Sequence, residues 1–163
     1  MIRNAKKEDI NEILKIYDTA RAFMRAHGNL NQWTGDYPGT SDLLSDIEYG
    51  NLYVLENENG ILCACFALIA GNDPTYNVID GGSWKSDTPY AAIHKVASNG
   101  TRKGVFAECV AFARERYTHL RIDTHHDNLP MQNAVAKEGF EYRGIIYLSN
   151  GDPRKAYEWI KED

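Results

Sequence analysis

The segment from Tyr90 to Phe112 constrains the fold most strongly, because the spacing of its apolar residues changes midway along it. Residues 90–97 are small, β-branched or aromatic, which is typical of a buried strand. Ser98-Asn99-Gly100 then favours a turn, and from Gly104 onward the apolar residues recur at the spacing of a helix. A strand that feeds a helix through such a turn leaves N–H groups at the helix start without partners.

These free donors favour a phosphate group, together with the positive end of the helix dipole and the neighbouring Arg102 and Lys103. An ordinary strand–turn–helix connection is the alternative. Two familiar phosphate motifs do not fit. A P-loop requires Lys and then Ser or Thr after its last glycine, whereas Val105 and Phe106 follow Gly104. A dinucleotide fingerprint requires three spaced glycines, and this turn has two.

The chain of 163 residues is long enough for one domain with a substantial core, and we expect residues 1–163 to form it. A net charge of −5 without a basic block speaks against nucleic acid or an anionic membrane as the main partner. We find no transmembrane-length apolar run and no signal-peptide core. Three cysteines, an odd number, fit a reducing environment best, so we expect a cytoplasmic protein.

Read in order, the chain predicts alternating strands and helices in one α/β (α+β) domain. The order of elements is β-α-α-β-β-β-α-β-α-β-β. The irregular stretch from Gly71 to Pro89 is long for a connection, and long loops are more often functional than idle. The expected strands cover residues 2–5, 52–56, 61–70, 90–97, 120–124, 140–148 and 155–160, with helices near 10–27, 41–47, 104–113 and 129–138.

Over essentially its whole length the chain resembles the GNAT superfamily of N-acetyltransferases. One family signature, Asn followed by an aliphatic helix and Lys-x-Gly-Phe, is kept from Asn128 to Phe140. The other, Arg/Gln-x-x-Gly-x-Gly/Ala, matches residues 101–106 only at Gly104, and the tyrosine common before the lysine is Val135. The resemblance implies a mixed central sheet and an acyltransferase that moves the acetyl group of acetyl-CoA to an amine of a small molecule or peptide.

Acetyl-CoA carries a pyrophosphate and an amide-rich pantetheine arm, and the central segment offers groups for both. N–H groups at the helix start suit the pyrophosphate, each charge-assisted hydrogen bond contributing roughly 1.5–3 kcal/mol. The edge of the strand at Val96 to Ser98 suits the pantetheine amides, which would pair with it as an added strand does. Phe106 argues against ordinary CoA binding, since its ring stands where close approach is needed, and Asn128 is equally suited to capping a helix. The expected cofactor-binding residues are Val96, Ala97, Ser98, Arg102, Lys103, Gly104, Val105, Phe106 and Asn128.

His94 is the candidate base, because it interrupts an otherwise small and apolar strand and histidine changes charge between pH 5 and 8. Strand alternation predicts that Ala92, His94 and Val96 share one face, and a backbone N–H at residues 96–97 could stabilise the oxyanion. A core histidine bonded to a backbone carbonyl is the alternative. Tyr147 is the candidate acid, although it could equally pack on the sheet.

Four residues in the two irregular segments are expected to form the acceptor wall: Gln32, Trp33, Tyr37 and Trp84. Aromatic side chains in a protein of net negative charge suit a cationic or partly apolar amine. Aromatic residues in glycine-rich loops also pack locally, so this placement is a hypothesis. Two other functions stay open: a GNAT-fold domain that binds CoA or a small ligand without catalysis, and a protein-interaction domain. Assembly into a homodimer is left open too.

We expect no metal site. Cys63 and Cys65 fall in one predicted strand, where alternation would turn both thiols toward the same side as core residues. His125, His126 and Asp127 could bind a cation, but a capped, solvated turn before a helix is the better interpretation.

Overall fold

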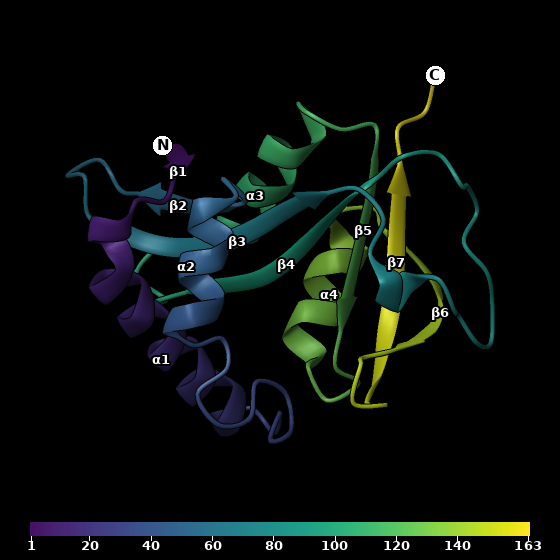
Figure 1. Ribbon diagram of the computed structural model, residues 1–163, viewed down its shortest axis with the longest axis horizontal. Helices are drawn as coiled ribbons and strands as arrows, with labels where there is room; N and C mark the ends of the chain where they lie inside the picture. Colours follow the sequence, from purple (N-terminus) through teal and green to yellow (C-terminus); the bar gives the residue numbers. More distant parts are fainter.

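The computed structural model describes residues 1–163, and a mixed seven-stranded sheet in the order β1-β2-β3-β4-β5-β7-β6 forms its centre (Figure 1). Only β4 and β5 are parallel, and every other neighbouring pair is antiparallel. The order of helices and strands is the expected one, with short 3₁₀ turns added at Lys7–Asp9 and Pro74–Tyr76. The strands are β1 (Ile2–Asn4), β2 (Leu52–Glu56), β3 (Leu62–Ala70), β4 (Ala91–Ser98), β5 (His119–Thr124), β6 (Glu141–Tyr147) and β7 (Pro153–Ile160), and the helices are α1 (Ile10–Ala26), α2 (Thr40–Glu48), α3 (Val105–Arg114) and α4 (Leu129–Lys137).

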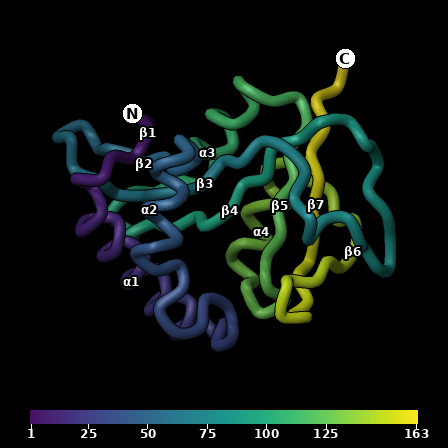
Figure 2. The backbone as a smooth tube through the Cα atoms, in the orientation of Figure 1, coloured from purple at the N-terminus to yellow at the C-terminus, as the bar shows by residue number.

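The sheet opens between β4 and β5. These strands pair only where Ala91–Ile93 faces Leu120–Ile122, and beyond this point they have no backbone pairing with each other. Figures 1 and 2 show the result: β3 and β4 run across the view, whereas β5 and β7 run up it. The second half of β4 therefore keeps its β3 partner on one side and has a free edge on the other.

Apolar residues at helical spacing hold the helices on the two faces of the sheet. The buried side chains of α1 recur every three or four residues, as in Ile13, Ile16, Tyr17 and Ala20, and they pack with β2, β3 and Leu43 of α2. On the opposite face, the buried side chains of α3 and α4 join the largest core cluster. The two helical layers leave the opening between β4 and β5 bordered by loops.

A β-bulge at Lys95 breaks the alternation of β4. Ala97 pairs with Cys65 and His94 with Ala67, so two residues of β4 lie opposite one residue of β3, and Lys95 adopts a φ of 55°. The expectation that Val96 shares the face of His94 is therefore wrong. Val96 packs against the core cluster on the α3 and α4 face, whereas Ala97 joins the α1 and α2 face.

A second irregularity separates the two strand cysteines. Cys63 and Cys65 are buried as expected, but Cys63 belongs to the core cluster under α3 and Cys65 to the one under α1. The register of β3 on β2 shifts between Leu55 and Glu56, opposite Cys63. This shift turns Cys63 to the other face, so the expectation that both thiols face one side is wrong.

The long segment between β3 and β4 is fastened to the far end of the sheet. Asp80 and Ile145 exchange two backbone hydrogen bonds of 2.8 Å, which adds a single bridge outside β6. Glycine is required at the contact. A Cβ on Gly82 would lie 1.9 Å from the carbonyl oxygen of Arg143, and one on Gly144 would lie 2.5 Å from that of Asp80.

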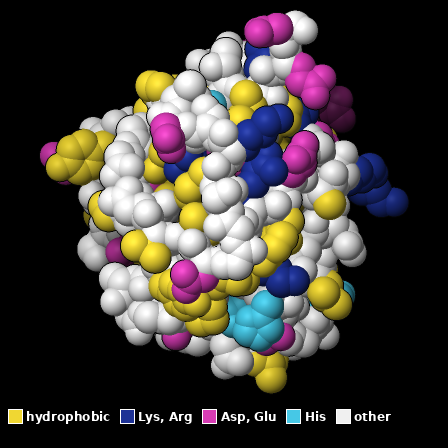
Figure 3. Space-filling model, turned by 90° about the vertical axis from the view of Figure 1, so that its right-hand side faces the viewer, with side chains coloured by type: hydrophobic (Ala, Val, Ile, Leu, Met, Phe, Trp, Pro, Cys, Tyr) yellow, Lys and Arg dark blue, Asp and Glu magenta, His cyan; other side chains and the backbone are white.

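No helix of this protein combines the length and apolar character needed to cross a bilayer. On the face that Figure 3 shows, basic side chains lie among acidic ones, so this face carries no patch of a single charge.

Candidate active site

The opening between β4 and β5 is a cleft of about 610 Å³, a volume typical of small-molecule sites. Its walls come from residues 31–37, the second half of β4, the end of β5, the start of α4 and residues 148–154. Of the residues predicted from sequence, Gln32, Trp33, Tyr37, His94, Val96 and Asn128 line it.

His94 enters this cleft from β4 and is held by a carboxylate from the long loop. Its Nε2 lies 3.0 Å from Oδ2 of Asp73. The other carboxylate oxygen of Asp73 accepts hydrogen bonds from the backbone N–H and the hydroxyl of Thr75. The backbone N–H of Asp73 donates to the hydroxyl of Tyr90 at 2.7 Å. Burial raises the pKa of Asp73, but the hydrogen bonds from His94 and Thr75 outweigh burial and lower it to about 2. Asp73 is thus a fixed, ionised partner.

A second carboxylate stands on the other side of the imidazole. Oδ2 of Asp123, at the end of β5, lies 3.9 Å from Nδ1 of His94 and accepts the Tyr76 hydroxyl at 2.6 Å. Burial and the nearby Asp123 raise the pKa of Tyr76 well above its usual value, so its proton stays on the hydroxyl. Tyr76 therefore donates a hydrogen bond to Asp123 and stays neutral while it does so.

This arrangement determines which nitrogen of His94 is free. An ionised carboxylate only accepts hydrogen bonds, so Nε2 of His94 carries the proton that faces Asp73. In the neutral imidazole Nδ1 then has the lone pair. The side chain of His94 is 25% exposed and lines the cleft, and Nδ1 forms no hydrogen bond within the protein. His94 thus has one ring nitrogen that no group of the protein occupies.

The start of α3 presents free N–H groups, as the sequence predicts. Gly104 precedes the helix with a φ of 76°, and the backbone N–H groups of residues 102–107 donate to no acceptor in the protein. Arg102 is ion-paired with Glu108 in the first turn of the helix. The ring of Phe106 is half-buried against the core cluster. The predicted obstruction by Phe106 therefore does not follow from its position, because the ring packs inward.

The comparisons with known proteins agree with this fold. A solved GNAT-family acetyltransferase from Streptococcus agalactiae is 32% identical, with a TM-score of 0.89, over 100% of this chain and 96% of that one. The chain belongs to the GNAT family. Two further solved structures share the fold: a GNAT-family acetyltransferase from Listeria monocytogenes (16% identity, TM-score 0.72, 98% and 94% coverage) and a ribosomal-protein-alanine N-acetyltransferase from Brucella melitensis (19%, 0.60, 98% and 99%). Neither a family model nor a curated protein matches the sequence.

In this GNAT protein the signature residue Asn128 is occupied by internal hydrogen bonds. Its Oδ1 accepts the N–H of Met131 at 3.2 Å, capping α4, and its amide donates to Oε1 of Gln32 at 3.0 Å. Asn29 donates to the same oxygen at 2.8 Å. The cap that the sequence offered as an alternative for Asn128 is therefore confirmed. Gln32 and Asn128 also join the loop after α1 to the start of α4 across the cleft, and the sequence analysis missed this link.

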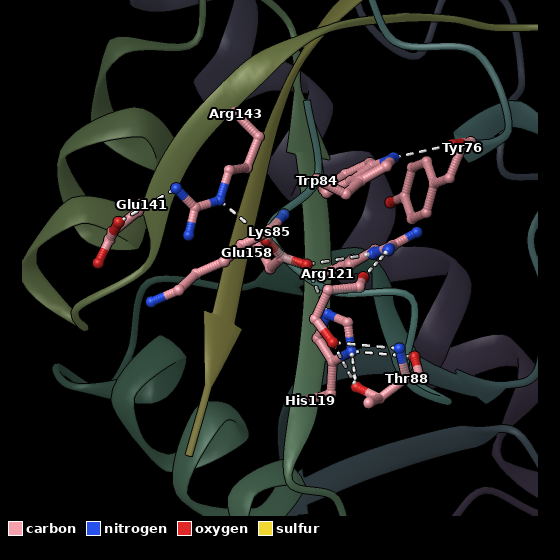
Figure 4. Close-up of polar contacts among 10 residues, drawn as sticks. Tyr76, Trp84, Lys85, Thr88, His119, Arg121, Glu141, Arg143 and Glu158 are labelled. Carbon is pink, nitrogen blue, oxygen red and sulfur yellow. Dashed lines mark hydrogen bonds and ion pairs between the residues drawn. The ribbon is translucent and has the colours of Figure 1, made fainter. Parts of the chain in front are cut away.

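Trp84 and Tyr147, predicted as an acceptor-wall residue and as the acid, do not line the cleft of this GNAT domain. Trp84 packs between the ring of Tyr76 at 5.3 Å and the guanidinium of Arg121 at 4.0 Å, and its Nε1 donates to the Tyr76 carbonyl (Figure 4). Tyr147 ends β6 on the surface, 40% exposed. Ala97, Ser98 and residues 102–106 lie on the same segment as the cleft-lining Val96 but do not line the cleft themselves.

The end of the long segment between β3 and β4 contacts a buried network of charged residues that the sequence did not reveal (Figure 4). Glu158 of β7 accepts hydrogen bonds from Nε2 of His119 at 2.6 Å, and from Nε of Arg143 and the backbone N–H of Lys85 at 2.8 Å each. Nδ1 of His119 meets the hydroxyl of Thr88 at 2.9 Å. The network therefore ties residues 85–88 to β5, β6 and β7. It thereby anchors the end of the same long segment that carries Asp73.

His125, His126 and Asp127 lie close enough for a cation, with candidate ligand atoms within 4.8 Å of one another. However, Nδ1 of His125 already accepts the N–H of Asp127 at 3.0 Å, and the two imidazoles are stacked at 4.3 Å. Burial lowers the pKa of His125. The three residues form the turn into α4, with His125 buried instead of solvated.

Proposed function

We propose that this GNAT protein transfers the acetyl group of acetyl-CoA to a primary amine of a small molecule or peptide, with His94 as the base. One observation carries the proposal: His94 is oriented by the ionised Asp73, keeps Nδ1 free of hydrogen bonds, and lines a cleft bordered by the unpaired edge of β4. A core histidine would be sealed and bonded to a backbone carbonyl, and His94 is neither.

The residues around the cleft suit acetyl-CoA as the co-substrate. The six free N–H groups at residues 102–107 match a pyrophosphate at the start of a helix. The β4 edge at Val96, Ala97 and Ser98 has no β5 partner and can pair with amides. When bound, acetyl-CoA supplies an activated thioester carbonyl, and the chain's part is to orient it and to move a proton.

A single acid–base group is enough to carry the proton of this reaction from the amine to the thiolate. The amine loses a proton as the C–N bond forms, and the departing thiolate needs one as the C–S bond breaks. Nδ1 of His94 can accept the first proton, directly or through one water, and then donate it. Tyr147 lies outside the cleft, so we do not assign it the role of acid. Asp123, near Nδ1, would attract the cationic form of the amine toward the base.

The test is product detection by intact mass from a pooled library of amines and short peptides with acetyl-CoA. We expect at least one acceptor to gain an acetyl group at a rate far above the uncatalysed one. Binding of acetyl-CoA in calorimetry without any acetylated product would instead support a domain that binds CoA without catalysis. Absence of both would overturn the proposal.

A further inference from the structure

Two arginines of this protein are buried, and only one of them has an acidic partner. Arg121 faces Glu158 at 3.7 Å. Arg154, which is 7% exposed at the start of β7, forms no ion pair, and its one hydrogen bond is from Nη1 to the Pro153 carbonyl at 2.8 Å. A buried charge without an opposite charge is costly to maintain, which makes Arg154 the exception among the buried charges of the fold.

The unused N–H groups of Arg154 open on the active-site cleft. Arg154 lines that cleft, and none of its nitrogens is both sealed from solvent and unpaired. Burial lowers the pKa of Arg154, partly offset by Asp123 and Asp152. Neither carboxylate pairs with it: Asp123 accepts the Tyr76 hydroxyl, and Asp152 is held in a turn by Asn150. The guanidinium therefore has free donors and no internal acceptor for them.

The position of Arg154 relative to His94 follows from the strand register. Ala156 of β7 pairs with Asp123 of β5, and Arg154 lies two residues before Ala156, on the same face of the sheet. Asp123 in turn faces Nδ1 of His94 at 3.9 Å. Arg154 and His94 therefore stand on either side of Asp123. A ligand whose amine lies at His94 would reach Arg154 with a group a few bonds away.

We propose that Arg154 binds a carboxylate of the acetyl acceptor, so that the acceptor is an amino acid or a closely similar amine that carries a carboxylate. A guanidinium matches a carboxylate with two parallel N–H donors. The nearby Asp123 and Asp152 disfavour a doubly charged phosphate at the same place, because repulsion grows with the charge of the ligand. This inference rests on the proposed transfer to an amine and names the substrate class for the same cleft.

The experiment compares amino acids with the amines obtained by removing their carboxylate, each with acetyl-CoA. The wild type should prefer the amino acid in kcat/KM. Arg154→Gln should lower kcat/KM for the amino acid by roughly tenfold to a hundredfold, the loss typical of a hydrogen bond to a charged group, and leave the matching amine nearly unchanged. Arg154→Lys, which keeps the charge, should fall between, and Arg116→Gln, an exposed arginine outside the cleft, should match the wild type.

Several outcomes would overturn the inference. One is a wild type that uses each amine as well as its amino acid, and another is an equal loss on both substrates in Arg154→Gln. A changed affinity for acetyl-CoA in calorimetry would assign Arg154 to the cofactor instead. If no substrate is acetylated, the proposed function fails separately, and calorimetry with amino acids still tests Arg154. Binding of amino acids, but not of the amines, that is lost in Arg154→Gln would then support the carboxylate site. If Arg154→Gln does not fold, Arg154→Lys carries the comparison.

Discussion

The molecule contains two histidine–carboxylate pairs with similar contacts and opposite surroundings. In the open pair, His94 meets Asp73 at 3.0 Å with side chains 25% and 22% exposed. In the sealed pair, His119 meets Glu158 at 2.6 Å with side chains 1% and 0% exposed. Tyr90 lies between them, since its hydroxyl accepts the N–H of Asp73 and its ring lies 5.7 Å from His119.

The two pairs differ in whether every polar atom of the histidine and the carboxylate has a hydrogen-bond partner. Every polar group of the sealed pair has a partner within the fold, including Thr88 for the second nitrogen of His119. In the open pair, His94 lines the cleft and its Nδ1 has no hydrogen bond. A histidine and a carboxylate thus have all their hydrogen bonds satisfied in the sealed pair, which suits a stabilising role, whereas the open pair keeps one nitrogen free for the chemistry that we propose.

The largest expected effect is a loss of activity when the histidine of the open pair is replaced. His94→Gln should lower kcat by about 10²–10⁴-fold, the usual loss for a positioned base, and leave the affinity for acetyl-CoA nearly unchanged. Steady-state kinetics and calorimetry measure the two quantities. His27→Gln, at an exposed site beyond α1, is the control and should behave like the wild type. A loss below about fivefold would make the open pair structural as well.

The second effect separates the pairs by stability. Glu158→Gln removes the negative charge that faces Arg121 and Arg143, and it should lower the free energy of unfolding by about 3 kcal/mol. Urea denaturation measures this change. Glu141→Gln is a matched control, because Glu141 also contacts Arg143, at 3.2 Å, but is 67% exposed. The control should lose less than about 1 kcal/mol, and an equal loss in both variants would contradict the special role of the sealed pair.

Acid should weaken both pairs. Burial raises the pKa of Glu158, but hydrogen bonds from His119, Lys85 and Arg143 outweigh it, so the pKa is about 2 against an ordinary 4.5. The carboxylate of Asp73 is likewise lowered to about 2 from 3.8. Groups with a lowered folded-state pKa stabilise fully above their unfolded pKa, and this contribution disappears as the pH falls toward 2. Unfolding free energies measured between pH 6 and 3 should therefore fall less steeply in Glu158→Gln; an identical slope would argue against the assignment.

The smallest effect concerns Trp84, which packs beside the sealed pair. Trp84→Phe removes the hydrogen bond from Nε1 to the Tyr76 carbonyl but keeps a six-membered aromatic ring at this position. We expect stability to fall by about 1 kcal/mol and the KM of the amine to change by less than about threefold. Thermal melts and kinetics check both. A large rise in KM for the amine alone would return Trp84 to the acceptor wall.

The sequence predicted the order of elements well, because apolar spacing and turn residues are local signals. The prediction of which side chains share a face of the sheet was wrong where a strand departs from regular alternation. No residue around Lys95 or Cys63 indicates a bulge in the sequence. The position of His94 could be inferred from its apolar neighbours. Its partners Asp73 and Asp123 could not, because they are 21 and 29 residues away and only the folded sheet brings them together.

The bridge between Asp80 and Ile145 has a consequence for self-association. A strand at the border of a sheet exposes backbone donors and acceptors to which another molecule can add. Here β6 is one border strand, and Asp80 occupies its outer N–H and C=O groups at Ile145. The other border strand, β1, has only three residues. Both borders thus offer a poor template for edge-to-edge aggregation, and a dimer formed by extending the sheet past β6 would first have to displace the loop that holds Asp73.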